Sequence, residues 1–219
     1  MWGRTAGVDV FRELIRIRAP LLTRIVQGAC RRLVRRADYV IFLATSDSQV
    51  LDESGVLRVS GGSSLESRQQ VESAMEAAGE SVDLVARRFA HGDEFFGRVV
   101  GEDIASFGWV TYRTRMIHGL CLKDAPGRAF LYNFHTFVAF RGRGLYPGLL
   151  GVIRQQLGRE GINEFIIDVE ARNSASLDGV GRAGFTIVAH AVFLIFLDQW
   201  YWPYWQSAVA GMLQEIFLT

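Results

Sequence analysis

A glycine-bearing turn between a long aromatic strand and an amphipathic helix constrains this chain more than any other segment. The aromatic and β-branched run Ala129–Phe140 predicts a strand. The turn Arg141-Gly142-Arg143-Gly144 follows, and a helical pattern then runs from about Tyr146 to Arg159. Pro147 occupies a favoured first-turn position of that helix. Its apolar face consists of Leu149, Leu150, Ile153 and Leu157.

This turn has the properties of a phosphate-binding loop. Its glycines let successive backbone amides converge, and the helix N-terminus adds partial positive charge at the same place. Arg141 and Arg143 add formal charge. A glycine turn before a helix is more often only a tight turn, so the motif alone is weak. It is neither the dinucleotide fingerprint, which needs a third glycine, nor a P-loop, which needs Gly-Lys-Ser/Thr.

The remaining pattern predicts a mixed α/β fold with a partly antiparallel sheet flanked by helices. Helices are expected over Glu66–Phe89 with a break at Gly79, Ser174–Arg182 and Gln206–Phe217. Further strands are expected at Tyr39–Ala44, Val56–Val59, Phe95–Val100, Ile104–Tyr112, Glu164–Glu170, Phe185–Val188 and Ala191–Leu197. Residues 113–128 are ambiguous.

The first forty residues are strongly basic, with nine arginines against three carboxylates. The spacing of apolar residues from Val8 to Arg36 predicts two helices separated at Pro20. We therefore expect a basic helical extension over residues 1–37 and the main domain over 38–219. Two interpretations of the extension stay open: a helical layer with solvated arginines, or peripheral contact with an anionic membrane.

Composition narrows the class of protein. The net charge is only +1, and the body beyond residue 40 is mildly acidic, which argues against nucleic-acid binding. The start lacks the apolar run of a signal peptide, and no uncharged stretch reaches the roughly 18 residues of a spanning helix. Cys30 and Cys121 stand alone and the four histidines are scattered, so no metal site is expected. The cytoplasm is the default location.

The C-terminal half resembles the GNAT superfamily of acyl-CoA-dependent N-acyltransferases. The family's cofactor motif is matched by Arg141, Gly144 and Tyr146. A strand ending at Val169, then Asn173, Ser176 and the pair Gly184-Phe185 follow in the family's register. The resemblance covers about 39–197, and firmly only 130–185. It implies a GNAT-like fold preceded by the extra helical segment.

The resemblance also implies roles for particular residues. Backbone groups of Phe134, His135 and Thr136 would pair with the pantetheine arm of acyl-CoA. Asn173 and Ser176 would bind the pantetheine side, and Asp168 takes the position of a carboxylate base. The backbone amides of Arg141, Gly142, Arg143, Gly144, Leu145 and Tyr146 would hold the pyrophosphate.

Two positions depart from the family pattern. Tyr146 stands where Gly or Ala is usual, and we expect its side chain to point away from the cofactor. Val180 replaces the tyrosine that protonates the leaving thiolate in many members, and valine cannot donate a proton. Tyr132, Tyr201 or Tyr204 are candidate substitutes, with Tyr132 preferred.

Several local alternatives stay open. Asp168 is a base, or it is a carboxylate that is exposed or paired with Arg172. The imidazole of His135 is expected to pack in the core. The aromatic run 200–205 predicts packing, a homodimer interface, an acceptor pocket or a membrane contact.

The sequence thus predicts transfer of an acyl group, acetyl by default, from acyl-CoA to an amine-bearing acceptor. The acceptor is a small molecule or a carrier-bound amine, attack is direct within a ternary complex, and no metal takes part. Two alternatives stay open: a catalytically silent CoA-binding or regulatory module, and an acyltransferase that uses a longer chain or a carrier-protein thioester.

Overall fold

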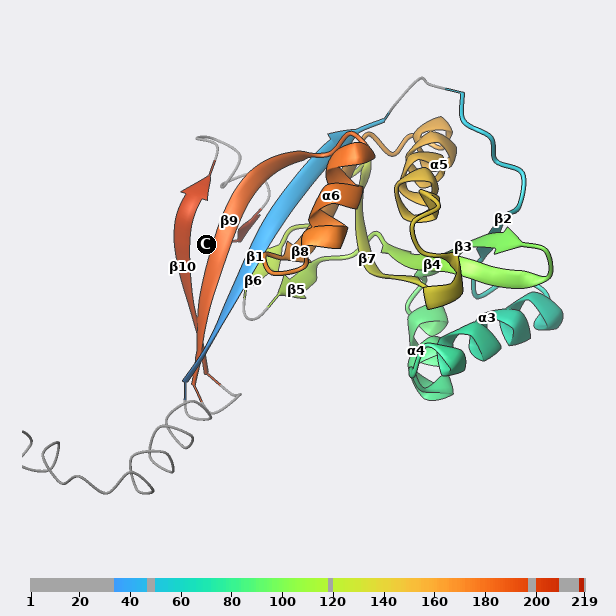
Figure 1. Ribbon diagram of the computed structural model, residues 1–219. Coiled ribbons are helices and arrows are strands. Elements are labelled where there is room, and N and C mark those ends of the chain that lie inside the picture. Colours follow the sequence, from blue (N-terminus) through green and yellow to red (C-terminus); the bar gives the residue numbers. More distant parts are fainter. Residues whose placement is uncertain (1–33, 47–49, 118–119, 197–199, 209–216, 219) are drawn as a thin grey trace, which may run out of the picture.

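The computed structural model describes residues 34–46, 50–117, 120–196, 200–208 and 217–218. They form an eight-stranded sheet of order β10-β9-β1-β8-β7-β4-β3-β2, shown in Figure 1. Its strands are β1 (Val34–Thr45), β2 (Val56–Val59), β3 (Glu94–Val100), β4 (Asp103–Thr111), β7 (Arg128–Thr136), β8 (Glu164–Glu170), β9 (Thr186–Phe196) and β10 (Trp200–Ala208). A small second sheet contains β5 (Arg115–Ile117), β6 (Leu120–Leu122) and β11 (Phe217–Leu218).

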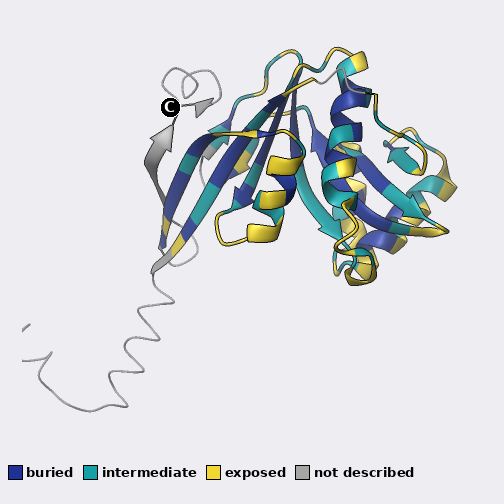
Figure 2. Cartoon of the chain, turned by 45° about the horizontal axis from the view of Figure 1, so that its top comes forward, coloured by how far each residue is buried: buried dark blue, intermediate teal, exposed yellow. Residues whose placement is uncertain are grey.

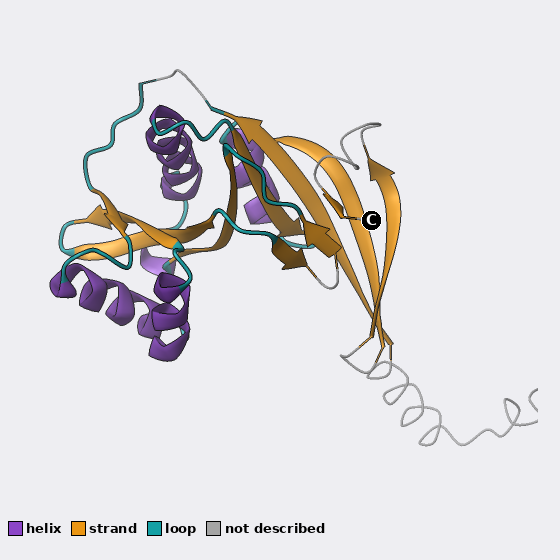
Figure 3. Ribbon diagram, turned by 180° about the vertical axis from the view of Figure 1, so that it is seen from behind, coloured by secondary structure: helices purple, strands orange, loops and turns teal. Residues whose placement is uncertain are grey.

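Helices cover both faces of the large sheet (Figure 3). On one face, α5 (Leu145–Arg159) and α6 (Ser174–Arg182) enclose a core with the central strands. On the other, α3 (Leu65–Ala77) and α4 (Val82–Ala90) pack on β2, β3 and β4 around a second core that contains Trp109. The β5–β6 hairpin contributes Ile117 and Leu122 to a third core beside it. Figure 2 shows the result: the central strands are buried, whereas α6 exposes its outer side.

Local sequence accounts for the separation of α3 from α4. Ser64 caps α3 by accepting a hydrogen bond from the backbone N–H of Ser67, and Ser81 caps α4 in the same way. Gly79 lies between them with a φ of 87°, a left-handed conformation that favours glycine. The predicted helix with a break at Gly79 is therefore confirmed.

The sheet opens between β7 and β8, its only parallel pair in the described part of the chain. These strands pair from Arg128↔Glu164 to Leu131↔Ile167 and then separate. Beyond that point β7 follows β4 as far as Thr136, while β8 follows β1 as far as Glu170. We call the resulting gap the split.

A β-bulge directs β7 away from β8. Between the pairs Phe107↔His135 and Trp109↔Tyr132, two residues of β7, Asn133 and Phe134, lie opposite the single residue Gly108 of β4. Within the bulge Asn133 has a φ of 52°. The ring of Phe134 lies over Gly108, where a Cβ would come within 2.2 Å of it. Glycine at 108 is therefore required for the bulged strand to pack.

Three expectations at the ends of elements are corrected. The strand expected over Ala129–Phe140 ends at Thr136, and Val138–Phe140 forms a 3₁₀ turn (η1), because Phe137 turns into the core under α3 and α4. The predicted strand pair 185–188 and 191–197 is one strand, β9, with β1 on one side and β10 on the other. The helix expected over 206–217 is wrong at both ends, since 206–208 belong to β10 and Phe217 to β11.

The described part of the chain includes the last residues of the segment assigned to the helical extension. Strand β1 begins at Val34, within the segment assigned to the helical extension, and pairs there with Phe196 of β9. The rest of the extension, residues 1–33, lies outside the described residues, so the helix and membrane interpretations stay predictions.

Candidate functional site

The glycine turn has an open, left-handed backbone. Gly142 and Gly144 have φ values of 77° and 71°, and Gly144 is the N-cap residue of α5. A Cβ at either position would meet nothing within 4 Å. The backbone conformation therefore explains these glycines, and the space above them is free to receive a ligand.

The two arginines of the turn fold back onto it. The Nε of Arg141 donates a hydrogen bond to the carbonyl oxygen of Thr136 at 3.0 Å. Arg143 donates to the carbonyl oxygen of Ala139 at 3.2 Å and lies over the ring of Phe140. Because the first N–H groups of α5 have no acceptor within the helix, the turn presents amide donors beside positive charge.

A cavity of about 420 Å³ opens over this turn. Ten of the eleven cofactor-binding residues predicted from sequence line it: Phe134, His135, Thr136, Arg141, Gly142, Gly144, Leu145, Tyr146, Asn173 and Ser176. Arg143 does not, because its side chain is directed to Ala139. The lining also includes Phe140, Pro147, Ala175 and Arg182. Arg182 was not predicted, since only the packing of α6 beside α5 brings it to the cavity.

Asn173 has a clear structural role at this cavity. Its Oδ1 accepts a hydrogen bond from the backbone N–H of Ser176 at 3.1 Å, which caps α6. The side-chain amide NH₂ remains as a donor. The asparagine that the resemblance assigned to the pantetheine side is thus held rigidly at the cavity wall.

A second cavity, of about 400 Å³, occupies the split. It shares Phe134, Tyr146, Asn173 and Ser176 with the first, so the two cavities adjoin. Its walls come from both faces of the sheet: Ile167 and Val169 belong to the core under α5 and α6, whereas Tyr39 and Tyr132 pack on the opposite side. The split therefore connects the glycine turn with the opposite face.

Tyr132 is engaged with charged groups on that opposite face. Its hydroxyl donates a hydrogen bond to Oδ2 of Asp93 at 2.7 Å. The guanidinium groups of Arg88 and Arg115 lie over its ring, 5.3 and 4.6 Å from the ring centre. Burial, with Asp93 as a further cause, raises the pKa of Tyr132. The hydroxyl proton of Tyr132 is therefore held in the hydrogen bond to Asp93 and is poorly placed for donation to a leaving group.

Asp168 lies across the split from Tyr132 and is ion-paired. Its Oδ1 is 3.1 Å from an NH₂ nitrogen of Arg115, and its side chain is 10 % exposed. The predicted alternative of a pair with Arg172 is wrong, because Arg172 pairs with Glu170 at 2.9 Å. Arg115 belongs to the segment that the sequence left ambiguous, so this partner could not have been found from the motif.

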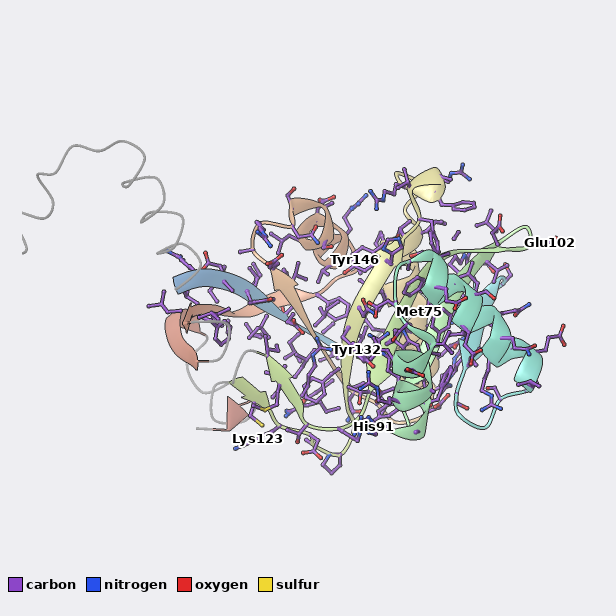
Figure 4. The ribbon with its side chains drawn as sticks, turned by 90° about the horizontal axis from the view of Figure 1, so that it is seen from below. Met75, His91, Glu102, Lys123, Tyr132 and Tyr146 are labelled. Atoms are coloured by element: carbon purple, nitrogen blue, oxygen red, sulfur yellow. The ribbon has the colours of Figure 1, made fainter. Side chains whose placement is uncertain are left out.

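Tyr146 does not point away from the site. Its ring lies 5.4 Å from that of Phe134 and against Gly179 of α6, and it lines both cavities. Figure 4 labels both tyrosines: Tyr146 lies between α6 and β7, and Tyr132 lies beside α4. Tyr146 rather than Tyr132 therefore reaches the split from the cofactor side.

The remaining candidate residues are Val180, His135, Tyr201 and Tyr204. Val180 is fully buried in the core, behind the split. The imidazole of His135 stacks on Phe107, and burial lowers its pKa, with Arg141 acting in the same direction. Tyr201 and Tyr204 lie in β10, and the strands β9 and β1 lie between β10 and β8. For these two tyrosines the structure describes the backbone and not the side chains.

No group of three or more His, Cys, Asp or Glu side chains in the described part of the chain could hold a metal ion. No helix in it is long and apolar enough to cross a membrane.

Comparison with known proteins identifies the fold. No family model matches the chain, and no curated protein does. Among solved structures, an acetyltransferase of the GNAT family from Colwellia psychrerythraea has a TM-score of 0.53, is 15 % identical, and is matched over 77 % of this chain and 60 % of its own. A GNAT-family protein from Novosphingobium aromaticivorans has a TM-score of 0.52 and 18 % identity over 73 % and 64 %.

A third similar structure is the GCN5-related N-acetyltransferase from Sphaerobacter thermophilus, with a TM-score of 0.50, 15 % identity, and coverage of 78 % of this chain. The chain spans 55 % of that protein's length and less than two thirds of each of the other two. The predicted fold is confirmed: the chain has a GNAT superfamily fold.

Proposed function

We propose that this chain, which has the GNAT fold, is an acyl-CoA-dependent N-acyltransferase. The observation that carries the proposal is the single cavity over the glycine turn. Ten residues chosen from the sequence for cofactor binding meet there, although they come from β7, the turn, α5 and α6. The cavity in the split adjoins it and has walls from the other face of the sheet.

The residues present fit acyl-CoA. The open space above Gly142 and Gly144 and the free amides at the start of α5 suit a pyrophosphate. The open edge of β7 at Phe134–Thr136 and the amide of Asn173 suit the two amides of a pantetheine arm. Arg141 and Arg182 add positive charge at the rim. When bound, acyl-CoA supplies an activated thioester.

The acceptor enters from the face of the sheet that carries Tyr132 and Asp168. The free amine forms a bond from its nitrogen to the thioester carbonyl carbon. The carbon–sulfur bond then breaks, and its electron pair leaves with sulfur. The excess proton on nitrogen passes to Asp168 or to water in the split. Holding both substrates in line supplies much of the acceleration.

A short acyl group, with acetyl as the default, agrees best with the walls of the split. Besides the apolar Ile167 and Val169, the lining includes the carboxylates of Asp168 and Glu170, and Asp168 is ion-paired with Arg115. A long hydrocarbon chain directed there would desolvate these charges without replacing their partners. We therefore expect acetyl-CoA to be used in preference to long-chain acyl-CoA.

A catalytically silent CoA-binding module is the second candidate. Two observations favour it: Val180 offers no proton, and the hydroxyl of Tyr132 is bound to Asp93. Such a module would bind CoA in the same cavity and release no thiol.

Thermal unfolding with CoA tests cofactor binding. We expect CoA to raise the Tm of the wild type, and a concentration 100 times Kd corresponds to about 2.7 kcal/mol. Gly144→Asp should abolish this shift, because the carboxylate repels phosphate. Gly101→Asp is the matched control: Gly101 has a φ of 66° and free space, but lies in the β3–β4 hairpin.

The control variant should respond to CoA like the wild type. Equal Tm shifts for Gly144→Asp and Gly101→Asp would exclude the turn as the phosphate site. Release of free thiol from acetyl-CoA with a panel of amines then tests transfer. Binding of CoA without thiol release from any amine would favour the silent module.

A further inference from the structure

The hydroxyl of Tyr146 is a polar group at the reaction site without an assigned partner. No residue in the described part of the chain forms a hydrogen bond with it. By contrast, the hydroxyl of Tyr132 is bound to Asp93. Because Tyr146 lines both cavities, a hydroxyl without a protein partner there is available to form a hydrogen bond with a ligand.

The fold makes room for this side chain at a specific place. The ring of Tyr146 rests on Gly179, where a Cβ would come within 2.5 Å of its Cδ1 atom. On the other side it meets the ring of Phe134. The ring is therefore clamped between α6 and β7, so the hydroxyl is held in position before any ligand arrives.

Tyr146 borders the split as well as the cavity over the glycine turn. Tyr146 lines both cavities, together with Ile167 and Asp168 in the second. Burial raises the pKa of Tyr146, and the Asp168 carboxylate raises it further. The phenol consequently stays protonated at neutral pH and remains a hydrogen-bond donor.

We propose that the Tyr146 hydroxyl donates a hydrogen bond to the sulfur atom that leaves the thioester, at the place where Val180 offers no polar group. This assignment rests on the proposed acyl transfer. As the carbon–sulfur bond breaks, negative charge collects on sulfur, and a donor fixed beside it stabilises that charge more than the neutral thioester.

The phenol acts as a donor and keeps its proton. A thiol has an ordinary pKa of about 8.5, well below that of a buried phenol, so transfer of the phenolic proton to the thiolate is unfavourable. The proton that finally neutralises sulfur is the one lost by the amine nitrogen, delivered directly or through water. Atoms and charge balance without any further reactant.

The pKa of the thiol group of bound CoA tests the assignment without requiring catalysis. Thiolate formation is followed by ultraviolet absorbance during a pH titration of the CoA complex. A hydrogen bond to the thiolate lowers the thiol pKa, so Tyr146→Phe should raise it by about one unit. Tyr112→Phe is the matched control, because Tyr112 is also a partly buried tyrosine with a raised pKa but lines neither cavity.

Kinetics give the second measurement. Tyr146→Phe should lower kcat roughly tenfold and leave KM for acetyl-CoA nearly unchanged, because the bond forms mainly in the transition state. Gly179→Ala should cause a similar loss by displacing the ring. Gly181→Ala, in the same helix with free space around it, should not.

The outcomes separate this assignment from the proposed function. If the wild type neither binds CoA nor releases thiol, the proposed function fails. If the wild type is active and Tyr146→Phe leaves both the thiol pKa and kcat unchanged, only the role of Tyr146 is wrong. If Tyr146→Phe weakens CoA binding alone, the hydroxyl serves the pantetheine arm and the assignment to sulfur is overturned.

Discussion

The side chains around the split differ in whether they already have a hydrogen-bond or ion-pair partner. Tyr132 is bound to Asp93, and Asp168 is paired with Arg115, whereas the hydroxyl of Tyr146 has no partner among the described residues. Residue type alone therefore misidentifies the available group. The sequence favoured Tyr132 as the substitute for Val180, but the geometry favours Tyr146.

The role of the Asp168 carboxylate can be tested by substitution. Asp168→Asn preserves the size of the side chain but removes the charge that faces the acceptor. If this carboxylate accepts the amine's proton, kcat should fall about 10²-fold or more. Steady-state kinetics with acetyl-CoA and the best amine measure the change.

Asp38→Asn is the matched control for that measurement. Asp38 is also ion-paired, with Arg36 at 2.7 Å, but it lines neither cavity in the split or over the turn. Its rate should equal that of the wild type. An unchanged rate for Asp168→Asn would leave the ion pair with Arg115 as a purely structural feature.

At the scale of elements, the bulge in β7 is what opens the sheet. The extra residue in β7 rotates its later part away from β8, and Asn133 absorbs the change with its positive φ. Asparagine tolerates this region better than most residues with a side chain, and a β-branched residue does not. The cavity in the split thus depends on one backbone conformation.

Substitutions at this position test that dependence. Asn133→Val should lower the free energy of unfolding by about 1–2 kcal/mol, because valine is strained in the left-handed region. Asn133→Gly removes the strain and loses only the hydrogen bond to Glu80, so it should be close to the wild type. Urea unfolding measures both, and equal destabilisation would contradict the strain argument.

At the scale of the whole molecule, strand β1 joins the two halves of the sheet. It pairs with β8 on one side and with β9 on the other. Because its pairing includes Val34, residues 34–37 belong to the sheet. An N-terminal segment therefore holds the C-terminal strands in place.

Three partly buried phenols make the stability of the molecule sensitive to alkaline pH. Burial raises the pKa of Tyr112, Tyr132 and Tyr146. Their contribution to stability is complete below the unfolded-state pKa of about 10 and is lost as pH rises through the folded-state values. The free energy of unfolding should thus fall as pH rises above about 10.

Urea unfolding at a series of alkaline pH values measures this slope. Each phenol contributes at most about 1.4 kcal/mol per pH unit while only the unfolded form ionises. Tyr112→Phe removes one of the three groups and should make the slope shallower. An identical slope in this variant would show that Tyr112 titrates normally in the folded protein.

Most local elements and the position of the glycine turn could be predicted from the sequence alone. The helix cap at Ser64, the glycines at 142 and 144, and apolar periodicity act over a few residues, so they are readable along the chain. The same holds for most of the cavity over the glycine turn, because its residues lie in two short segments, at the end of β7 with the turn and at the start of α6.

Only the tertiary structure decided which groups face one another across the split. Arg115, Asp93 and Gly179 lie far in sequence from the residues they contact, and no local pattern records those contacts. The strand that separates β8 from β9 likewise comes from the N-terminal side. Local propensity reports only near neighbours, whereas the environment of a catalytic side chain is set by packing between distant segments.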